Sequence, residues 1–358
     1  MNSRVRLLLS IGLPVLLVIV VAGAFLLQQQ RAGSGNVGAT GTASSQQAPQ
    51  KLTQMSLALD WTPNTNHTGI YVALKQGWYR QQGIDLKILP YSSNVSPDTL
   101  VSTGKADVGI SSTESIVADK ATGQPVVSIA AILQHNTSAL VSLASSNIKR
   151  PRDLDGKIYG GFGAPYEQAV VSAIIKKDGG KGTFKNVTLD VNAMDALKSH
   201  RIDFVWIFEG VEGVEAQREG VKLNTFPITD YGIPDYYTPT IITGPNQIKN
   251  EPDLLKKFMA ATAQGYEYAR THVNESAQML IDAAGKSVFP DPGFVMASQE
   301  FNSKHYADPG RKWGLQDAVA WHGYPKFMLD AGAITDTAGK PIKSIDFDSL
   351  YTDQFLPQ

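Results

Sequence analysis

The stretch MSLALDWTPNTNHTGIYVALKQGWYRQQGIDLKILP, residues 55–90, decides the fold of this chain. Apolar side chains alternate along residues 55–60 as in a strand, residues 71–82 have a helical pattern, and residues 85–90 form the next strand. Strand, helix and strand at this spacing predict a parallel sheet covered by helices, and therefore an α/β fold. Ligands of such sheets bind beyond the carboxyl ends of the strands, where loops lead into helices.

The alternation of strands and helices begins again after Leu154-Asp-Gly-Lys157. A strand at residues 238–243 leads back to the first unit, and residues 253–330 have a mainly helical pattern. One α/β unit inserted in another predicts two lobes joined by a hinge, with the ligand in the cleft between them. We place lobe 1, with the C-terminal helices, at residues 52–142 and 243–358, and lobe 2 at residues 143–242.

The composition excludes several function classes. The chain has 358 residues, no cysteine and a formal net charge of -1. The absence of cysteine excludes thiolate metal sites, disulfides and cysteine nucleophiles. The near-zero net charge provides no positive electrostatic field that would attract nucleic acid. The histidines are scattered along the chain without metal-ligand spacing, and no Ser-His-Asp order is visible. We expect no metal site, no catalytic residues and no nucleic-acid partner.

The first fifty residues indicate export. Arg4 and Arg6 precede an uncharged stretch over residues 7–27, and Arg31 is the next charge. This pattern, within residues 1–31, favours a single-pass membrane anchor with the body outside the cytoplasm. A cleaved signal peptide, and a periplasmic protein, is the alternative, because Ala22-Gly23-Ala24 resembles a cleavage site. Residues 32–51 are rich in Gly, Ser, Ala and Gln and are expected to form a flexible tether.

Several short motifs are similar to those of one family. They are residues 59–73, Gly77-Trp-Tyr79, Gly83-Ile-Asp85, residues 104–109, Leu154-Asp-Gly-Lys157 and Tyr237-Thr-Pro239. In this order and spacing, from residue 55 to about 327, the chain resembles the NMT1/ThiY-like substrate-binding proteins. The resemblance implies a type II periplasmic-binding-protein fold and an ABC importer whose permease and ATPase are the partners. It also implies a small ligand, since family members bind thiamine pyrimidine precursors, other heteroaromatics, sulfonates or, in some relatives, riboflavin.

Candidate ligand-binding residues in the first lobe follow its strands. Asp60 and Trp61 end the first strand, so Trp61 offers a stacking face, and Asp60 or Asn64 can accept hydrogen bonds from ring N–H and amino groups. Trp61 as a core residue and Asp60 as a helix cap remain the alternatives. Ser111, Ser112 and Thr113 open a helix and can bind solute oxygens, or can act as a simple N-cap.

The second lobe supplies the opposite wall of the expected cleft. Tyr166, after a glycine-rich loop, is placed to clamp the other ring face. Trp206 and Glu209 end a strand, and the Glu209 carboxylate can accept two hydrogen bonds from an amino-substituted ring. Secondary candidates, each of which could be packing, are Tyr91, Asn136 and Tyr237.

The ligand class is narrowed by the absence of basic residues from these loops, which argues against sulfonate, nitrate or phosphate. Pyrimidine binders of the resembled family tend to have Trp where this chain has Val211. This difference favours a wider ring, narrowly riboflavin. A thiamine-precursor pyrimidine, formylaminopyrimidine or its hydroxymethyl relative, is the alternative.

Two further classes remain to be weighed. Pyrimidine synthases of the resembled family bind pyridoxal phosphate and need Lys and His where Ser111 and Ser115 stand here. They work in the cytosol and have a cysteine-rich segment that this chain lacks. We therefore expect a binding protein without a cofactor, and not an enzyme. A membrane-tethered sensor domain would use the same fold and cleft, and the sequence leaves it open.

Overall fold

The computed structural model describes residues 51–189 and 193–358. By internal contacts the chain divides into residues 1–48 and residues 49–358, and every helix and strand given below belongs to the second unit. The predicted anchor and nearly all of the predicted tether lie outside the described residues. Among the residues that are described, no helix is both long enough and apolar enough to cross a bilayer.

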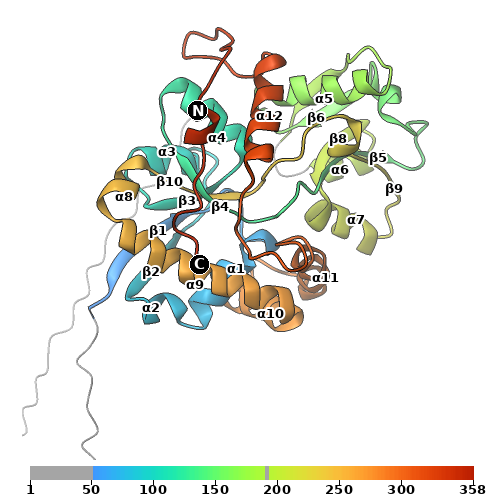
Figure 1. The fold of residues 1–358 in the computed structure, drawn as a ribbon. Coiled ribbons are helices and arrows are strands. Elements are labelled where there is room, and N and C mark those ends of the chain that lie inside the picture. The colour runs from blue at the N-terminus through green and yellow to red at the C-terminus, as the bar shows by residue number, and fades with distance from the viewer. Residues whose placement is uncertain (1–50, 190–192) are drawn as a thin grey trace, which may run out of the picture. The chain divides into compact units, whose positions relative to one another are not determined.

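The first sheet has the strand order β2-β1-β3-β10-β4 (Figure 1). Its strands are β1 (Thr53–Ala58), β2 (Ile84–Leu89), β3 (Val108–Ser111), β4 (Val127–Ala131) and β10 (Thr240–Thr243). The helices that follow these strands are α1 (Thr68–Lys75), α2 (Trp78–Gln81), α3 (Pro97–Ser102), α4 (Thr113–Thr122), α8 (Pro245–Asn250), α9 (Pro252–Thr271) and α10 (Val273–Ala284). The predicted helix over residues 71–82 is thus two helices, because Gly77 between them has a left-handed φ of 72°.

Alternation along β1 decides which side of the first sheet each side chain joins. Met55, Leu57 and Leu59 are buried in the core that includes residues of α9, whereas Ala58 belongs to the core that includes residues of α4. Successive strand residues point to opposite faces. Asp60, two residues beyond Ala58, therefore continues on the side of α3 and α4.

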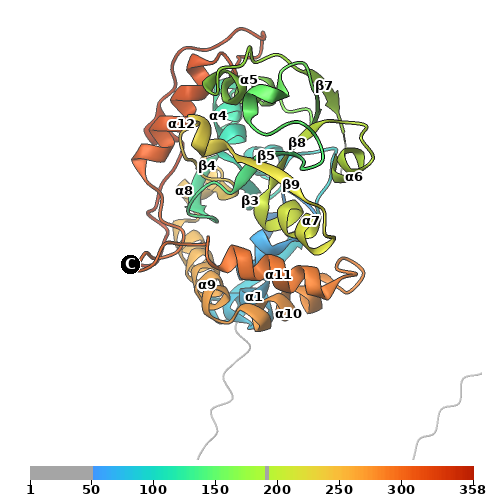
Figure 2. The ribbon, with the colours of Figure 1, turned by 90° about the vertical axis from the view of Figure 1, so that its right-hand side faces the viewer.

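The second sheet has the order β7-β6-β8-β5-β9 (Figure 2). Its strands are β5 (Ser138–Leu143), β6 (Ile158–Gly161), β7 (Lys185–Thr188), β8 (Phe204–Phe208) and β9 (Leu223–Pro227). Its helices are α5 (Glu167–Lys177), α6 (Ala193–Lys198) and α7 (Val214–Arg218), and a π-helical turn (Glu209–Gly213) leads from β8 into α7. In β8, Val205 and Ile207 pack towards α6, while Phe204 packs in the core that contains α5 residues.

The two-lobed α/β class is confirmed, but neither sheet is wholly parallel. β10 runs antiparallel to β3 and β4, and β5 runs antiparallel to β8 and β9. The reason is the path of the chain: β5 follows directly from β4, and β10 follows β9, so each enters its sheet from the side where the other strands end. The sequence pattern missed β5 and β9. β5 lies in the second sheet, although most of its residues fall within the limits predicted for lobe 1. The exact limits of the two lobes stay a prediction.

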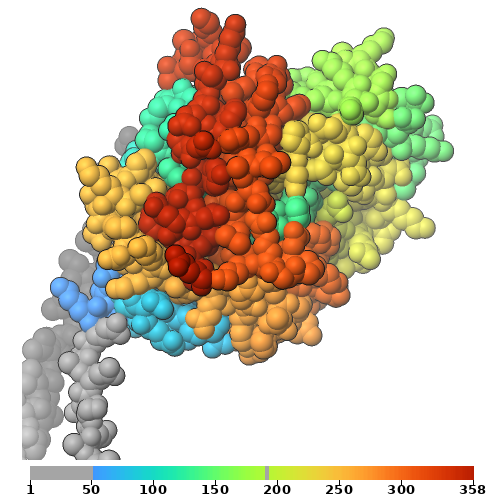
Figure 3. Space-filling view, in the orientation of Figure 1, coloured from blue at the N-terminus to red at the C-terminus, as the bar shows by residue number. Residues whose placement is uncertain are grey.

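The C-terminal segment covers the outer edge of the first sheet. After α11 (Pro292–Ser303) and α12 (Ala318–Asp330), residues near the C-terminus pair with β4, since the Ser128 N–H donates to the Leu350 carbonyl at 2.9 Å. Tyr351 stacks on Trp321 of α12 at 5.3 Å between ring centroids. In the space-filling view this red segment lies across the face shown (Figure 3).

Close packing of α1 on α9 depends on glycine. A Cβ atom on Gly265 of α9 would collide with the backbone carbonyl of Gly69 in α1. The Tyr266 ring in turn occupies the space where Gly69 would have a side chain. The backbones of the two helices therefore approach as closely as hydrogen-only side chains allow.

We expect Gly265→Val to lower the free energy of unfolding by about 1–3 kcal/mol, because a buried backbone clash cannot relax as a side-chain rotation can. Urea unfolding of the full chain, followed by tryptophan fluorescence, measures the change. The exposed neighbour Gln264 provides the control: Gln264→Ala should change the same free energy by less than about 0.5 kcal/mol. Unchanged stability of Gly265→Val would contradict this packing.

Candidate functional site

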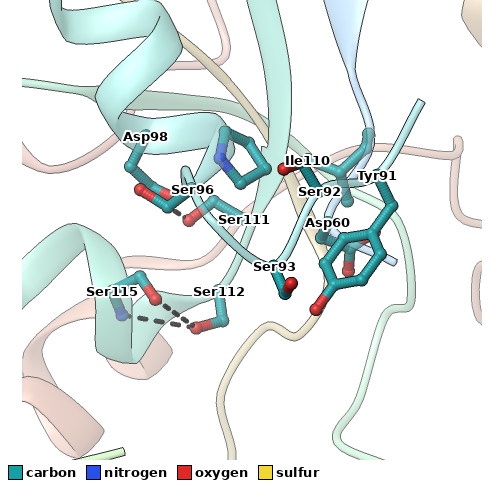
Figure 4. A pocket seen from close by; sticks show the side chains of 11 residues that line it. Asp60, Tyr91, Ser92, Ser93, Ser96, Asp98, Ile110, Ser111, Ser112 and Ser115 are labelled. Carbon is teal, nitrogen blue, oxygen red and sulfur yellow. Dashed lines mark hydrogen bonds between the residues drawn. The ribbon is translucent and has the colours of Figure 1, made fainter. Parts of the chain in front are cut away.

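A cavity of about 280 Å³ opens at the carboxyl edge of the first sheet (Figure 4). The loops after β1, β2 and β3 and the first turns of α3 and α4 line it. Its polar groups are the carboxyls of Asp60 and Asp98 and the hydroxyls of Ser92, Ser93, Ser96, Ser111, Ser112, Ser115 and Tyr91. No Lys, Arg or His of the described chain is among its lining residues. Four predicted site residues, Asp60, Tyr91, Ser111 and Ser112, thus meet in one cavity.

Asp60 is held in place by His67. The His67 ring is fully buried, and its Nε2 lies 2.8 Å from Asp60 Oδ1. The backbone N–H of Asn64 donates to His67 Nδ1 at 3.3 Å, so Nε2 carries the ring hydrogen and donates it to the carboxylate. Asn64 itself acts locally, since its Oδ1 caps the following turn at the N–H of Asn66. The contact of Asn64 with a ligand stays a prediction.

Asp98 forms a second buried carboxyl in the cavity wall. It is only 4% exposed, and the Ser111 hydroxyl donates to its Oδ1 at 2.5 Å. Asp119 of α4 lies near it, and the two carboxyls interact electrostatically. Burial raises the pKa of Asp98, and burial together with the charge of Asp98 raises the pKa of Asp119 to about 8. At neutral pH the Asp119 carboxyl is therefore largely protonated.

Aromatic rings flank the cavity. On the first-sheet side, Trp61 is 38% exposed and lies 4.9 Å from Tyr91 between ring centroids. On the second-sheet side, Phe162 is 53% exposed and makes edge contacts with Tyr166 at 6.1 Å and with Trp206 at 6.4 Å. Exposed rings of this kind offer flat apolar faces to a planar solute.

Tyr166 connects the two sides. Burial and the nearby carboxyls of Glu114 and Glu167 raise the pKa of the Tyr166 hydroxyl, whereas its hydrogen bond to Ser112 lowers it. The loop before Tyr166 is shaped by Glu167, whose Oε1 accepts the N–H of Ala164 and whose Oε2 accepts the N–H of Phe162. The second-sheet loop thus reaches the cavity wall at Ser112.

Glu209 does not join this cavity. It lines a second cavity of about 430 Å³ beneath α7, together with Ile207 of β8 and Phe301 of α11. Ile207 and Trp206 point to opposite faces of β8, and Glu209 lies with Ile207. Burial raises the pKa of the Glu209 carboxyl.

The turn that carries Glu209 is fixed against α11. The Ser298 hydroxyl donates to the Gly210 carbonyl, and a Cβ atom on Gly210 would collide with Asn302. Asn302 Nδ2 also donates to Thr65 Oγ1 at 2.8 Å, so α11 holds this turn and the loop after β1 together. Neighbouring Val211 belongs to this turn and is not among the residues that line the first cavity.

Three other predicted residues hold the segments that cross between the sheets. The Thr113 hydroxyl donates to the Tyr237 carbonyl at 2.8 Å, and the Tyr237 hydroxyl accepts the N–H of Asp317 at 2.7 Å. The N–H of Asn136 donates to Asp235 Oδ1 at 2.9 Å, which joins one crossing to the other. None of the three is among the residues that line the first cavity, and their contact with a ligand stays a prediction.

Sequence reasoning missed Asp98, Phe162 and the serines of the β2–α3 loop. Asp98 stands in Ser-Pro-Asp at a helix start, where an acidic residue ordinarily satisfies the helix dipole. Phe162 lies between two glycines in the sequence, and a large ring in such a loop was a signal that the sequence did contain. The structure shows this ring to be exposed. Within residues 51–189 and 193–358, no cluster of three or more acidic or histidine side chains could hold a metal ion.

The raised pKa of Asp119 predicts a pH effect on stability. Between about pH 4 and 8 the folded carboxyl pair binds more protons than the unfolded chain, so the free energy of unfolding falls as pH rises. The slope is at most about 1.4 kcal/mol per pH unit for one extra proton. Asp119→Asn should make this fall shallower, as measured by urea unfolding at pH 5 and pH 8. The exposed Asp253→Asn is the control, and an equal fall in Asp119→Asn and the native chain would contradict the pair.

Comparison with known proteins adds relatives of two kinds. The chain is 26% identical over 322 residues to the formylaminopyrimidine-binding protein of Halalkalibacterium halodurans, a match that covers 88% of this chain and 94% of that protein. It is 29% identical over 309 residues to the 4-amino-5-hydroxymethyl-2-methylpyrimidine phosphate synthase of Legionella pneumophila, covering 85% of this chain and 92% of that protein.

The fold is that of periplasmic binding proteins. The ligand-binding component of an ABC-type import system of Staphylococcus aureus, solved with zinc bound, superposes with a TM-score of 0.62 at 13% identity. The superposition covers 84% of this chain and 97% of the Staphylococcus aureus chain. The family that matches by sequence, over residues 64–276, is described as NMT1/THI5 like. With more than half of its length matched, the chain belongs to the NMT1/THI5-like family.

Proposed function

We propose that the chain is the extracytoplasmic solute-binding protein of an ABC importer and captures a thiamine-precursor aminopyrimidine of the formylaminopyrimidine type. The observation that carries this proposal is the first cavity, where two carboxyls and a set of hydroxyls lie beside Tyr91, whose ring contacts the exposed Trp61. The relative that binds formylaminopyrimidine, aligned over nearly all of both chains, supports the same ligand class.

The cavity suits a neutral ring that bears amino groups. Carboxylates and serine hydroxyls accept hydrogen bonds from amino N–H groups, while the hydroxyls can also donate to ring nitrogens. Trp61 and Tyr91 on one side and Phe162 on the other offer ring faces for stacking. An anionic handle such as a sulfonate would meet the carboxyls of Asp60 and Asp98 without a compensating cation from the lining.

The first cavity favours a pyrimidine as the ligand. From the sequence, the residue at Val211 narrowly favoured riboflavin. Val211 is not part of the first cavity and is therefore a poor guide to ring size there. The cavity volume of about 280 Å³ lies just below the range of about 300–1,000 Å³ that holds drug-sized ligands. A single substituted ring fits this space better than a three-ring flavin.

Capture, rather than synthesis, is the activity that we propose. The Legionella relative is named a synthase, so synthesis is the second candidate. In this chain the Ser111 hydroxyl donates to Asp98, and the Ser115 N–H donates to the Ser112 side chain. These two serines stand where the synthases of the resembled family carry their reactive Lys and His. In this chain the two positions therefore contribute hydroxyl groups to the wall of the first cavity.

The proposed mechanism is closure of the lobes around the ligand. Tyr166 and Phe162, on the loop after β6, close against Ser112 and Trp61 when a planar ring bridges the two sides. A ligand that contacts both lobes shifts the population to the closed form. The closed form then docks on the permease of an importer driven by an ATPase, with the N-terminal segment holding the body near the membrane.

Calorimetric titration of the full chain tests the ligand. We expect 4-amino-5-hydroxymethyl-2-methylpyrimidine and formylaminopyrimidine to bind with micromolar or tighter affinity, and riboflavin to bind at least tenfold more weakly. Quenching of flavin fluorescence with tight saturation would instead return riboflavin as the ligand. Formation of an aminopyrimidine phosphate when the chain is incubated with pyridoxal phosphate would favour the synthase reading.

Substitution of Trp61 tests the position of the site. Trp61→Ala should weaken pyrimidine binding by tenfold or more, because about 1.4 kcal/mol of stacking and burial is lost. Glu209→Gln, in the second cavity, should change the dissociation constant by less than about twofold. Both variants should retain the circular dichroism of the native chain. The reverse ranking of the two variants would place the ligand beneath α7.

A further inference from the structure

Helix α11 belongs to the core of the first lobe but also lies against the second lobe, beneath α7 (Figure 2). Val295, in the middle of α11, packs with Leu280 and Ile281 of α10 in one buried apolar cluster. Ser298 donates to the carbonyl of Gly210, in the π-helical turn that follows β8. Lobe 1 and lobe 2 therefore meet along α11.

A chain of hydrogen bonds runs through buried side chains towards lobe 2. Asn302 Nδ2 donates to Thr65 Oγ1 at 2.8 Å, and Thr65 Oγ1 lies 2.6 Å from Ser298 Oγ. The Gly210 carbonyl can only accept, so the hydroxyl hydrogen of Ser298 goes to that carbonyl, and the Thr65 hydroxyl donates to Ser298. The other Nδ2 hydrogen of Asn302 goes to Asn66 Oδ1 at 2.9 Å. Each hydroxyl hydrogen of the chain is thereby assigned.

The last hydrogen bond of this chain is the one that crosses between the lobes. Its donor is held by lobe 1, because Thr65 and Asn302 orient the Ser298 hydroxyl, and hydrogen bonds in such chains strengthen one another. Its acceptor is a backbone carbonyl of lobe 2. If the lobes parted, water would reach both the Ser298 hydroxyl and the Gly210 carbonyl. The bond is therefore able to break without leaving a buried unpaired group.

The contact between α11 and α7 is not close-packed. The second cavity, of about 430 Å³, is lined by Phe301 of α11 and by Val214 and Gln217 of α7. At the start of α11, Arg218 Nη2 lies 2.9 Å from Asp291 Oδ2, and both residues are exposed. Permanent contacts inside a fold pack as densely as cores, and exposed ion pairs contribute little stability. These features are typical of two surfaces that separate.

We propose that Ser298 is an interlobe latch, whose hydrogen bond to the Gly210 carbonyl holds lobe 2 against α11 when the lobes close and breaks when they open. This inference rests on the lobe closure of the proposed function and names a contact that regulates it. The apparent affinity for a ligand falls in proportion to the fraction of molecules that are able to close. Loss of the latch should therefore weaken binding, although Ser298 does not line the first cavity.

Single-molecule energy transfer between the lobes measures the latch directly. The full chain has no cysteine, so Lys181→Cys in lobe 2 and Lys257→Cys in lobe 1, both at exposed positions, accept the two dyes. In this background, Ser298→Ala should raise the ratio of open to closed molecules about three- to tenfold, because one buried hydrogen bond is lost. The matched control Ser303→Ala removes a hydroxyl that donates to the Glu300 carbonyl within α11, and should change the ratio less than about twofold.

Binding kinetics separate the latch from a contact with the ligand. The latch forms after the ligand has entered, so Ser298→Ala should raise the dissociation rate constant of 4-amino-5-hydroxymethyl-2-methylpyrimidine about three- to tenfold and change the association rate constant less than about twofold. Gly210→Ala should act in the same direction and at least as strongly, since its Cβ would meet Asn302 and keep the turn away from α11. Stopped-flow tryptophan fluorescence gives both rate constants.

The outcomes distinguish the two proposals. A native chain that binds no aminopyrimidine overturns the proposed function, while the energy-transfer ratio without pyrimidine still tests the latch. An unchanged ratio of open to closed molecules in Ser298→Ala overturns the latch, however tightly the pyrimidine binds. A lower free energy of unfolding with an unchanged ratio also overturns it, because Ser298 would then be a packing residue. If Gly210→Ala fails to fold, the comparison of Ser298→Ala with Ser303→Ala still decides.

Discussion

Each sheet of this protein contains one strand that runs against its neighbours, and the candidate site depends on both of these strands. β10 and β5 are reversed because the chain enters each sheet from the edge at which the other strands end. That edge is where the two sheets exchange the chain, so their strand ends are brought to the same region. The carboxylate of Asp235 ties one crossing to the other through the N–H of Asn136. Thr113, in turn, fastens the start of α4 to the returning segment at the Tyr237 carbonyl.

The chemistry of the first cavity follows from this arrangement and from the period of the strands. Asp60 and Ser111 lie on the side of the first sheet that α3 covers, so they meet Asp98 at the start of that helix. Buried His67 fixes Asp60, and Asp119 stands behind Asp98. The result is a wall of carboxyl and hydroxyl oxygen atoms with no Lys, Arg or His among the residues that line the cavity. Such a wall selects by hydrogen bonding and shape rather than by attraction of an ion.

The sequence predicted the α/β class, two lobes and most of the strands and helices, because alternation and helical period are local properties. It missed β5, whose residues are buried on both faces and so do not alternate between apolar and polar side chains. It placed Glu209 on the same wall as Trp206. Glu209 instead lies just beyond the end of β8, where the π-helical turn fixes it beneath α7. Asp98 was invisible because its partners, Ser111 and Asp119, come together only through the packing of α3 and α4 on the sheet.

A crystal structure of the full chain with 4-amino-5-hydroxymethyl-2-methylpyrimidine bound would test the central claim most directly. The account predicts the ring in the cavity of about 280 Å³, between the Trp61 side and the Phe162 side. A ring bound beneath α7, beside Glu209 and Phe301, would contradict it.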